Sequence, residues 1–170
     1  MPAFRALILF TLITGLAYPF LMLGIGKLLF PYQSSGSLIR NQEQVEGSVL
    51  IGQSFDQPHY FWPRPSATGP KPYNAELSAG SNMGPLHPDL KKPVSGMPRD
   101  LWTASGSGLD PHISPEAARY QMTRVSQARK LSTAQVATLI DRYIEGRQLG
   151  VLGEARVNVV LLNQALDGKK

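Results

Sequence analysis

The chain has 170 residues, a formal net charge of +5 and no cysteine. The absence of cysteine excludes disulfide frameworks, thiolate zinc sites and a cysteine nucleophile. Basic residues are scattered along the chain, which is typical of a solvated surface and argues against nucleic-acid binding.

The first predicted element is a membrane-spanning helix at roughly residues 6–26, a stretch without charge. At 1.5 Å per residue, about 20 apolar residues cross the ~30 Å hydrocarbon core of a bilayer. A cleaved signal peptide would have a shorter apolar region followed by small residues, whereas residues 28–30 are bulky. The length of the run, which is enough to span a bilayer, and the lack of a polar face argue against a helix in the core of a soluble domain. We therefore expect an uncleaved anchor, with residues 1–30 as the anchor segment.

The anchor runs from Ala6 to Gly26, with Gly15, Pro19 and Gly24 inside it. Pro19 lacks a backbone N–H and should disturb the helix locally. The positive charges on the two sides of the span nearly balance, so charge gives only a small preference for a cytoplasmic N-terminus. With one span, that orientation would place the rest of the chain outside the cell membrane.

The sequence after the anchor segment predicts a single loop-rich α+β domain with short strands and two or three helices. Residues 31–46 form a polar connector, and residues 47–170 form the soluble domain. Apolar or aromatic runs bounded by Gly and Pro predict short strands at 48–55 and 60–62. Pro and Gly recur every few positions in 63–100, which predicts loop.

The clearest soluble helix is predicted to begin after Ser114. Ser114 can cap the helix, Pro115 suits its first position, and Glu116 suits the positive end of the helix dipole. An apolar stripe at three- and four-residue spacing follows, formed by Ala118, Met122, Val125 and the stem of Arg129.

A second helix is predicted to start near Ser132 or Thr133 and to end at Gly146. The last apolar stretch, residues 157–166, alternates at first and then becomes continuous, which indicates a strand leading into a short helix. The apolar face of the second helix consists of Val136, Leu139, Ile140 and Tyr143.

A loop of small residues at 105–108 (SGSG) is the main candidate for phosphate binding. Its backbone N–H groups could form an anion-binding nest. The P-loop signature, however, needs Gly-Lys-Ser/Thr, which the sequence lacks. A tight, closely packed turn explains the same residues.

A hydrolase site is a weaker interpretation. Ser105, Ser107, Asp110 and His112 are the residue types of a nucleophile triad, but they lie within eight positions and form no Gly-x-Ser-x-Gly elbow. A turn at Asp110 and a loop residue at His112 explain them equally.

Metal and base-stacking sites are also weak candidates. The three histidines are far apart in sequence and lack ligand spacing. The aromatic run 59–62 followed by Arg64 could stack on bases, but an aromatic core cluster, or a surface that docks on a protein or a membrane, explains it better.

Several motifs follow one another along the chain: TLITGLAYP (11–19), GSLIR (36–40), GSVLIGQSF (47–55), YFWPRPSA (60–67), YNAELSAGSNMGP (73–85), DLWTASGSGLDPHISPEAA (100–118), YQ (120–121), RVSQARKLS (124–132) and VNVVLLNQALD (157–167). This ordered set resembles the KdpC family, the C subunits of the Kdp high-affinity potassium-transporting ATPase. The resemblance covers essentially the whole chain. One departure is visible, because family members usually carry a longer, helix-forming segment where this chain has only residues 87–99 with three prolines.

The resemblance implies a non-catalytic accessory subunit of an inner-membrane potassium pump. Its partners would be a potassium-channel-like subunit, a P-type ATPase subunit and a small single-helix subunit, in contact with membrane lipid. The family is described as a catalytic chaperone that raises the ATPase subunit's affinity for ATP, with no tightly bound cofactor of its own. Small residues in the anchor would let it pack against other membrane helices.

Two ways of acting on ATP remain open. A domain outside the membrane cannot touch ATP across the bilayer and would act through the assembled complex. A domain on the cytoplasmic side could contact the nucleotide directly. The residues implied in such contact are Ser105, Gly106, Ser107, Gly108 and Gln121.

Overall fold

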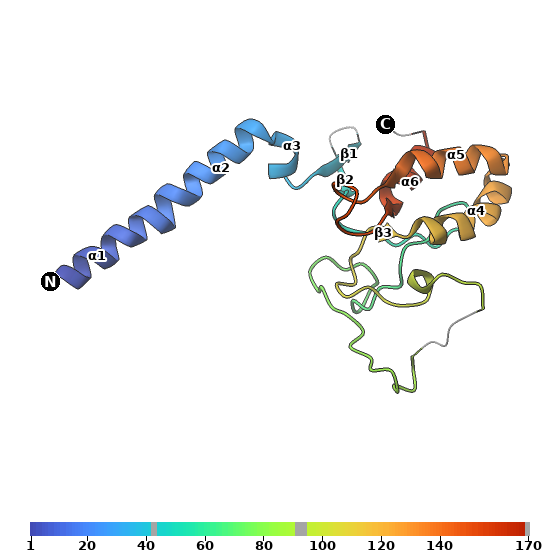
Figure 1. Cartoon of the computed structure of the whole chain (residues 1–170), viewed down its shortest axis with the longest axis horizontal. Coiled ribbons are helices and arrows are strands. Elements are labelled where there is room, and N and C mark those ends of the chain that lie inside the picture. Colours follow the sequence, from blue (N-terminus) through green and yellow to red (C-terminus); the bar gives the residue numbers. More distant parts are fainter. Residues whose placement is uncertain (42–43, 91–94, 169–170) are drawn as a thin grey trace. The chain divides into compact units, whose positions relative to one another are not determined.

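The computed structural model describes residues 1–41, 44–90 and 95–168. It divides into two compact units, residues 1–48 and residues 49–170. Figure 1 shows an N-terminal helical segment followed by a domain of short strands, helices and long loops. The α+β fold expected from the sequence is confirmed.

The N-terminal segment is helical over 28 residues, Pro2–Leu29, or about 42 Å at 1.5 Å per residue. It consists of α1 (Pro2–Phe10), a π-helical stretch η1 (Thr11–Ala17) and α2 (Tyr18–Leu29). The π-helical bonding ends immediately before Pro19, where the Tyr18 N–H reaches back five residues to the Ile13 carbonyl. Proline cannot donate the next backbone hydrogen bond, so the local disturbance takes the form of this wider turn.

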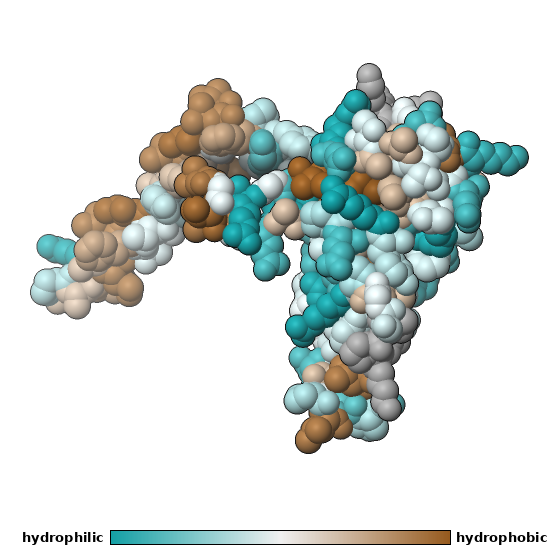
Figure 2. All heavy atoms as spheres, turned by 45° about the vertical axis from the view of Figure 1, so that its right-hand side comes forward, coloured by the Kyte–Doolittle hydropathy of each residue, from teal (hydrophilic) through white to brown (hydrophobic). Residues whose placement is uncertain are grey.

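Residues of Pro2–Leu29 are almost all exposed, and none is buried. Figure 2 shows hydrophobic side chains gathered along this helix. The segment is long and apolar enough to cross a bilayer, as predicted.

The segment expected as a polar connector contains regular structure. A short helix, α3 (Pro31–Ser34), precedes two antiparallel strands, β1 (Leu38–Asn41) and β2 (Gln44–Ser48). The Ser48 hydroxyl donates to the Gly36 carbonyl at 2.7 Å, which ties the end of β2 to the start of β1.

The second unit contains a small antiparallel sheet in the order β3-β5-β4. The strands are β3 (His112–Ile113), β4 (Ile144–Glu145) and β5 (Arg156–Asn158). Val157 of the central strand lies opposite both Ile113 and Ile144 and is fully buried. The C-terminal stretch is a strand followed by helix α6 (Val159–Leu166), as the sequence predicted.

The two predicted helices are present as α4 (Pro115–Arg129) and α5 (Thr133–Tyr143). The Ser114 hydroxyl accepts from the Ala117 N–H at 3.0 Å, and Ser132 forms a reciprocal capping box with Gln135. The two helices and the sheet enclose one core, whose buried members include Phe61, Ile113, Val125, Val136, Ile140, Val157, Val159 and Leu162.

Three sequence predictions need correction or restriction. The strands expected at 48–55 and 60–62 are absent; apart from Ser48, which ends β2, those residues form turns, bends and irregular loop. Helix α5 ends at Tyr143 rather than Gly146, because Ile144 leaves the helix to pair with Val157. Residues 63–98 are loop wherever they are described, and the 3-10 turn η2 (Arg99–Leu101) follows them; residues 91–94 of the short 87–99 segment lie outside the described part.

Candidate functional site

The 105–108 loop is packed against two other loops of its domain. The Ser105 N–H donates to the Pro65 carbonyl at 3.2 Å, and the Ala79 N–H donates to the Ser107 carbonyl at 3.0 Å. The Ser66 hydroxyl donates to the Gly108 carbonyl at 2.6 Å. The loop is therefore a junction between segments 65–68 and 78–80.

Gly108 is required at this junction for two reasons. Its φ is +68°, in the left-handed region that favours glycine. A Cβ built there would lie 2.6 Å from both the Ala79 carbonyl oxygen and the Thr68 Cγ2 atom. Gly106 differs, because a Cβ at that position meets nothing within 4 Å.

Several donors of the proposed anion nest are already used. The Gly108 N–H points to the Ser105 carbonyl at 3.4 Å, and the Leu109 N–H donates to the Ser107 hydroxyl at 3.1 Å. Ser105 is 2% exposed, and its buried hydroxyl has no hydrogen-bond partner among the described residues. Gly106 and Ser107 are exposed and remain the accessible part of the loop.

Gln121, the fifth candidate, lies on α4 and binds the backbone of Trp62. Its Oε1 accepts from the Trp62 N–H at 2.8 Å, and its Nε2 donates to the Trp62 carbonyl at 3.0 Å. Asn163 on α6 holds the adjacent Phe61 in the same way, at 2.9 and 3.0 Å. Two side-chain amides thus satisfy the backbone groups of Phe61 and Trp62, although these residues belong to no strand.

The role of these amides was missed from the sequence. The only signal was an amide residue inside each helix near an apolar face. The structure brings residues 105–108 together with 65–68 and 78–80, whereas the hydrogen bonds of Gln121 go to Trp62 and Arg124.

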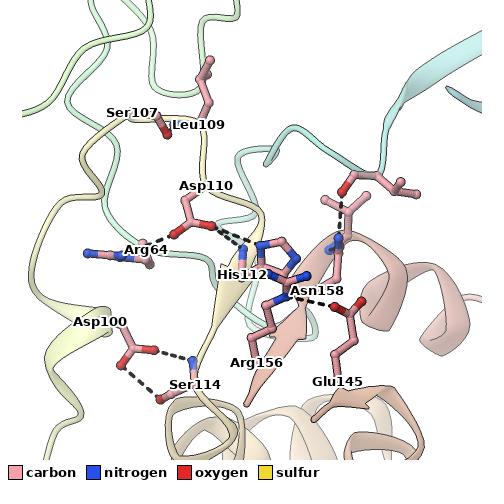
Figure 3. A network of polar contacts seen from close by, with 12 residues as sticks. Arg64, Asp100, Ser107, Leu109, Asp110, His112, Ser114, Glu145, Arg156 and Asn158 are labelled. Atoms are coloured by element: carbon pink, nitrogen blue, oxygen red, sulfur yellow. Dashed lines mark hydrogen bonds and ion pairs between the residues drawn. The ribbon is translucent and has the colours of Figure 1, made fainter. Parts of the chain in front are cut away.

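Asp110 is the centre of a polar network that follows the loop. Figure 3 shows its carboxylate between Arg64 and His112, at 3.3 Å from each side chain. It also accepts from the His112 backbone N–H at 3.0 Å, which is the turn that the sequence predicted. Burial raises the pKa of Asp110, but the hydrogen bonds from His112 and the charge of Arg64 outweigh it and hold the pKa below its ordinary value.

The same network does not assemble a nucleophile triad. In the described part of the chain, no hydrogen bond joins His112 to Ser105 or Ser107. In Figure 3 Ser107 lies apart from His112, with Asp110 between them. The arrangement is a positioned ion-pair network that fixes the turn leading into β3.

A cleft of about 610 Å³ adjoins this network. At one wall Asp100 accepts from the Ser114 N–H at 2.6 Å and so occupies the N-terminal end of α4. Charges of both signs line the cleft, so it does not select an anion or a cation by charge alone. These charged residues are Arg64, Arg99, Arg156, Asp100, Asp110, Glu116 and Glu154.

The described residues contain no group of three or more side chains able to hold a metal ion. Of the aromatic run 59–62, Phe61 is buried in the core. The Trp62 ring lies under the Arg124 guanidinium, 3.7 Å from the ring centroid. The run is therefore a core and surface-packing element of the domain.

The anchor positions are open to neighbours. Ala6, Gly15, Pro19 and Gly24 are exposed, and a Cβ at Gly24 would meet nothing within 4 Å. Gly26 is partly covered: a Cβ built at this position would lie 3.9 Å from the Ser34 Cβ atom.

Comparison with known proteins identifies the family of this chain. The family model described as "KdpC: K+-transporting ATPase, c chain" matches residues 1–168. The chain belongs to the KdpC family. The match includes both the apolar helix and the domain that carries the 105–108 loop.

Named relatives agree with the family match. The "Potassium-transporting ATPase KdpC subunit" of Sorangium cellulosum is 50% identical, over 99% of this chain and 97% of the relative. That of Methylococcus capsulatus is 53% identical, over 98% of this chain and 95% of the relative. The first alignment extends over 184 positions, more than the 170 residues of this chain, so the relative carries residues that this chain lacks.

Proposed function

We propose that the chain is a non-catalytic accessory subunit of an ATP-driven, high-affinity potassium uptake complex. The observation that carries this proposal is the family match over residues 1–168, anchor and domain together. Relatives with 50–53% identity are named as subunits of a potassium-transporting ATPase. The expected partners are a potassium-channel-like subunit and a P-type ATPase subunit, with a small single-helix subunit beside them.

The apolar helix supports a role in assembly within the membrane. No residue of Pro2–Leu29 is buried, and all but Gly26 are exposed, so nearly the whole surface of the helix is available to lipid and to other helices. Exposed Gly15 and Gly24 allow another helix to approach closely. The helix would hold the subunit in the cell inner membrane as a single-pass protein.

Within this proposal, the chain raises the affinity of the ATPase subunit for ATP without binding ATP itself. Two of the five candidate nucleotide ligands are not available to a ligand: the Gln121 side chain is bonded to the Trp62 backbone, and Ser105 is buried. The effect on ATP would then be a coupling free energy carried by the assembled complex, about 1.4 kcal/mol for each tenfold change in affinity.

Affinity purification of the chain in mild detergent tests the assembly. We expect two larger membrane subunits and potassium-stimulated ATPase activity to co-purify. Removing the chain from the complex should raise the KM for ATP about tenfold, and adding it back should restore the original value. An unchanged KM would refute the chaperone role while leaving the assembly role intact.

We place the soluble domain outside the cytoplasm. The balance of charge around the helix supports this orientation by a small margin. A phosphatase that is active only when exported, fused at Lys170, should be active. A cytoplasmic C-terminus would overturn this placement.

Direct nucleotide binding is the second candidate, because Gly106 and Ser107 are exposed. The full chain would then bind an ATP analogue in detergent at physiological salt. Absence of saturable binding, together with a normal chaperone effect in the complex, would leave the indirect role.

A further inference from the structure

The loop at residues 147–153 (RQLGVLG) exposes an unusual amount of apolar surface. It follows β4 and carries three aliphatic side chains, which we call the apolar tip: Leu149 is 90% exposed, Val151 73% and Leu152 56%. Large apolar side chains grouped on a soluble surface mark interaction sites more often than isolated ones do.

Hydrogen bonds give the loop a defined shape. The backbones of Gln148 and Leu152 exchange two hydrogen bonds of 2.9 Å each, which closes the loop like a small hairpin. The Gly150 N–H donates to the Arg147 carbonyl at 3.1 Å, and the Val151 N–H to the Gln148 carbonyl at 3.2 Å. The apolar tip is thus presented in a fixed arrangement before any partner binds.

The backbone of the loop is strained at Leu149, although the side chain of this residue is almost fully exposed. Leu149 has a φ of +52°, in the left-handed region that a branched side chain rarely occupies. Gly150 and Gly153 also have positive φ, of +76° each, but glycine adopts this region freely. A strained residue whose side chain is left almost fully exposed points to a role outside its own domain.

The charges beside the apolar tip favour a protein over a lipid surface. Four exposed charged residues flank it, Glu145, Arg147, Glu154 and Arg156, two of each sign. Arg156 and Glu145 pair at 2.9 Å. An apolar centre with a balanced polar rim is the pattern of a protein interface, whereas binding to anionic lipid would favour an excess of basic residues.

We propose that the apolar tip docks into an apolar pocket on another subunit of the potassium-transporting ATPase complex. This inference rests on the proposed function and assigns it a contact element. Three aliphatic side chains cannot form a whole interface, so the tip acts as an anchoring point at the centre of a larger contact.

A photo-crosslinking amino acid at position 149 of the full chain, in membranes containing the complex, tests the contact. We expect a covalent adduct with a larger protein subunit. The matched control is position 86, because Leu86 is an equally exposed leucine (95%) in a different loop. An adduct with lipid alone, or equal protein cross-linking from positions 149 and 86, would overturn the proposal.

Substitutions supply an independent readout. Leu149→Asp should speed dissociation of the partner subunits about tenfold, whereas Leu86→Asp should leave it unchanged. Leu149→Gly removes the side chain and relieves the positive φ, so it should weaken assembly while the thermal stability of the full chain stays equal or rises.

The outcomes separate this inference from the proposed function. If the wild-type chain purifies without partner subunits, the proposed function fails, and the docking tip fails with it. If the wild-type chain assembles and Leu149→Asp assembles equally well, only the docking tip is refuted.

Discussion

The domain contains two glycine-containing loops that contrast in almost every respect. Residues 105–108 contain no large side chain, and their backbone is hydrogen-bonded to two neighbouring loops. Residues 147–153 carry three large aliphatic side chains, which are exposed to solvent. A distinctive motif can therefore mark a packing junction, while an ordinary aliphatic loop presents the surface available for binding.

The largest expected loss of stability comes from a substitution of Gly108, in the 105–108 loop. Gly108→Ala places a Cβ 2.6 Å from the Ala79 carbonyl oxygen and forces an alanine to φ +68°. We expect a loss of roughly 2–4 kcal/mol of unfolding free energy. Gly106→Ala is the matched control, because its Cβ meets nothing within 4 Å. Equal denaturant midpoints for the two variants would contradict the packing role of the loop.

The next effect is at Gln121. Gln121→Ala removes both hydrogen bonds to the Trp62 backbone and leaves a half-buried N–H and carbonyl without partners. We expect a loss of about 1–3 kcal/mol in chemical unfolding. Gln127→Ala, at an exposed position of the same helix, should change stability by less than about 0.5 kcal/mol. A nucleotide ligand, by contrast, could be removed without affecting the stability of the free chain.

A smaller effect depends on pH through Asp110. Because its pKa is lower when folded than when unfolded, Asp110 stabilises the fold above its ordinary pKa of about 4. This contribution is lost as pH falls through the lowered value. The difference in unfolding free energy between wild type and Asp110→Asn should therefore be smaller at pH 3 than at pH 6. A difference that grows on acidification would contradict the assignment.

The smallest effect on stability is expected from a substitution in the loop at residues 147–153. Leu149→Asp should change the unfolding free energy by less than about 0.5 kcal/mol, because the side chain is 90% exposed. Thermal unfolding of the full chain measures this. A large loss of stability would show that the loop, like residues 105–108, serves the fold rather than a partner.

Elements with local sequence rules were predicted well. The apolar helix, the start of α4 at Ser114 and the start of α5 at Ser132 follow from apolar length and from capping side chains, which act over a few residues. The strand and helix at the C-terminus follow from periodicity.

Elements that depend on distant partners were not predictable. Residues 60–62 have the composition of a strand. The backbone groups of Phe61 and Trp62, however, bond to the side chains of Asn163 and Gln121, which are 102 and 59 residues away along the chain. Likewise, α5 ends early because Ile144 pairs with Val157. At the candidate site, the turn at Asp110 could be predicted, whereas its ion pair with Arg64 depends on the fold.

The apolar helix Pro2–Leu29 also determines how strong the contacts of its domain need to be. A domain held to a bilayer by a single short chain meets membrane partners at an effective concentration on the order of millimolar. Under that condition a contact too weak to retain the freely diffusing domain is occupied most of the time. Three aliphatic side chains at the centre of a modest contact can then be enough to set the orientation of the subunit.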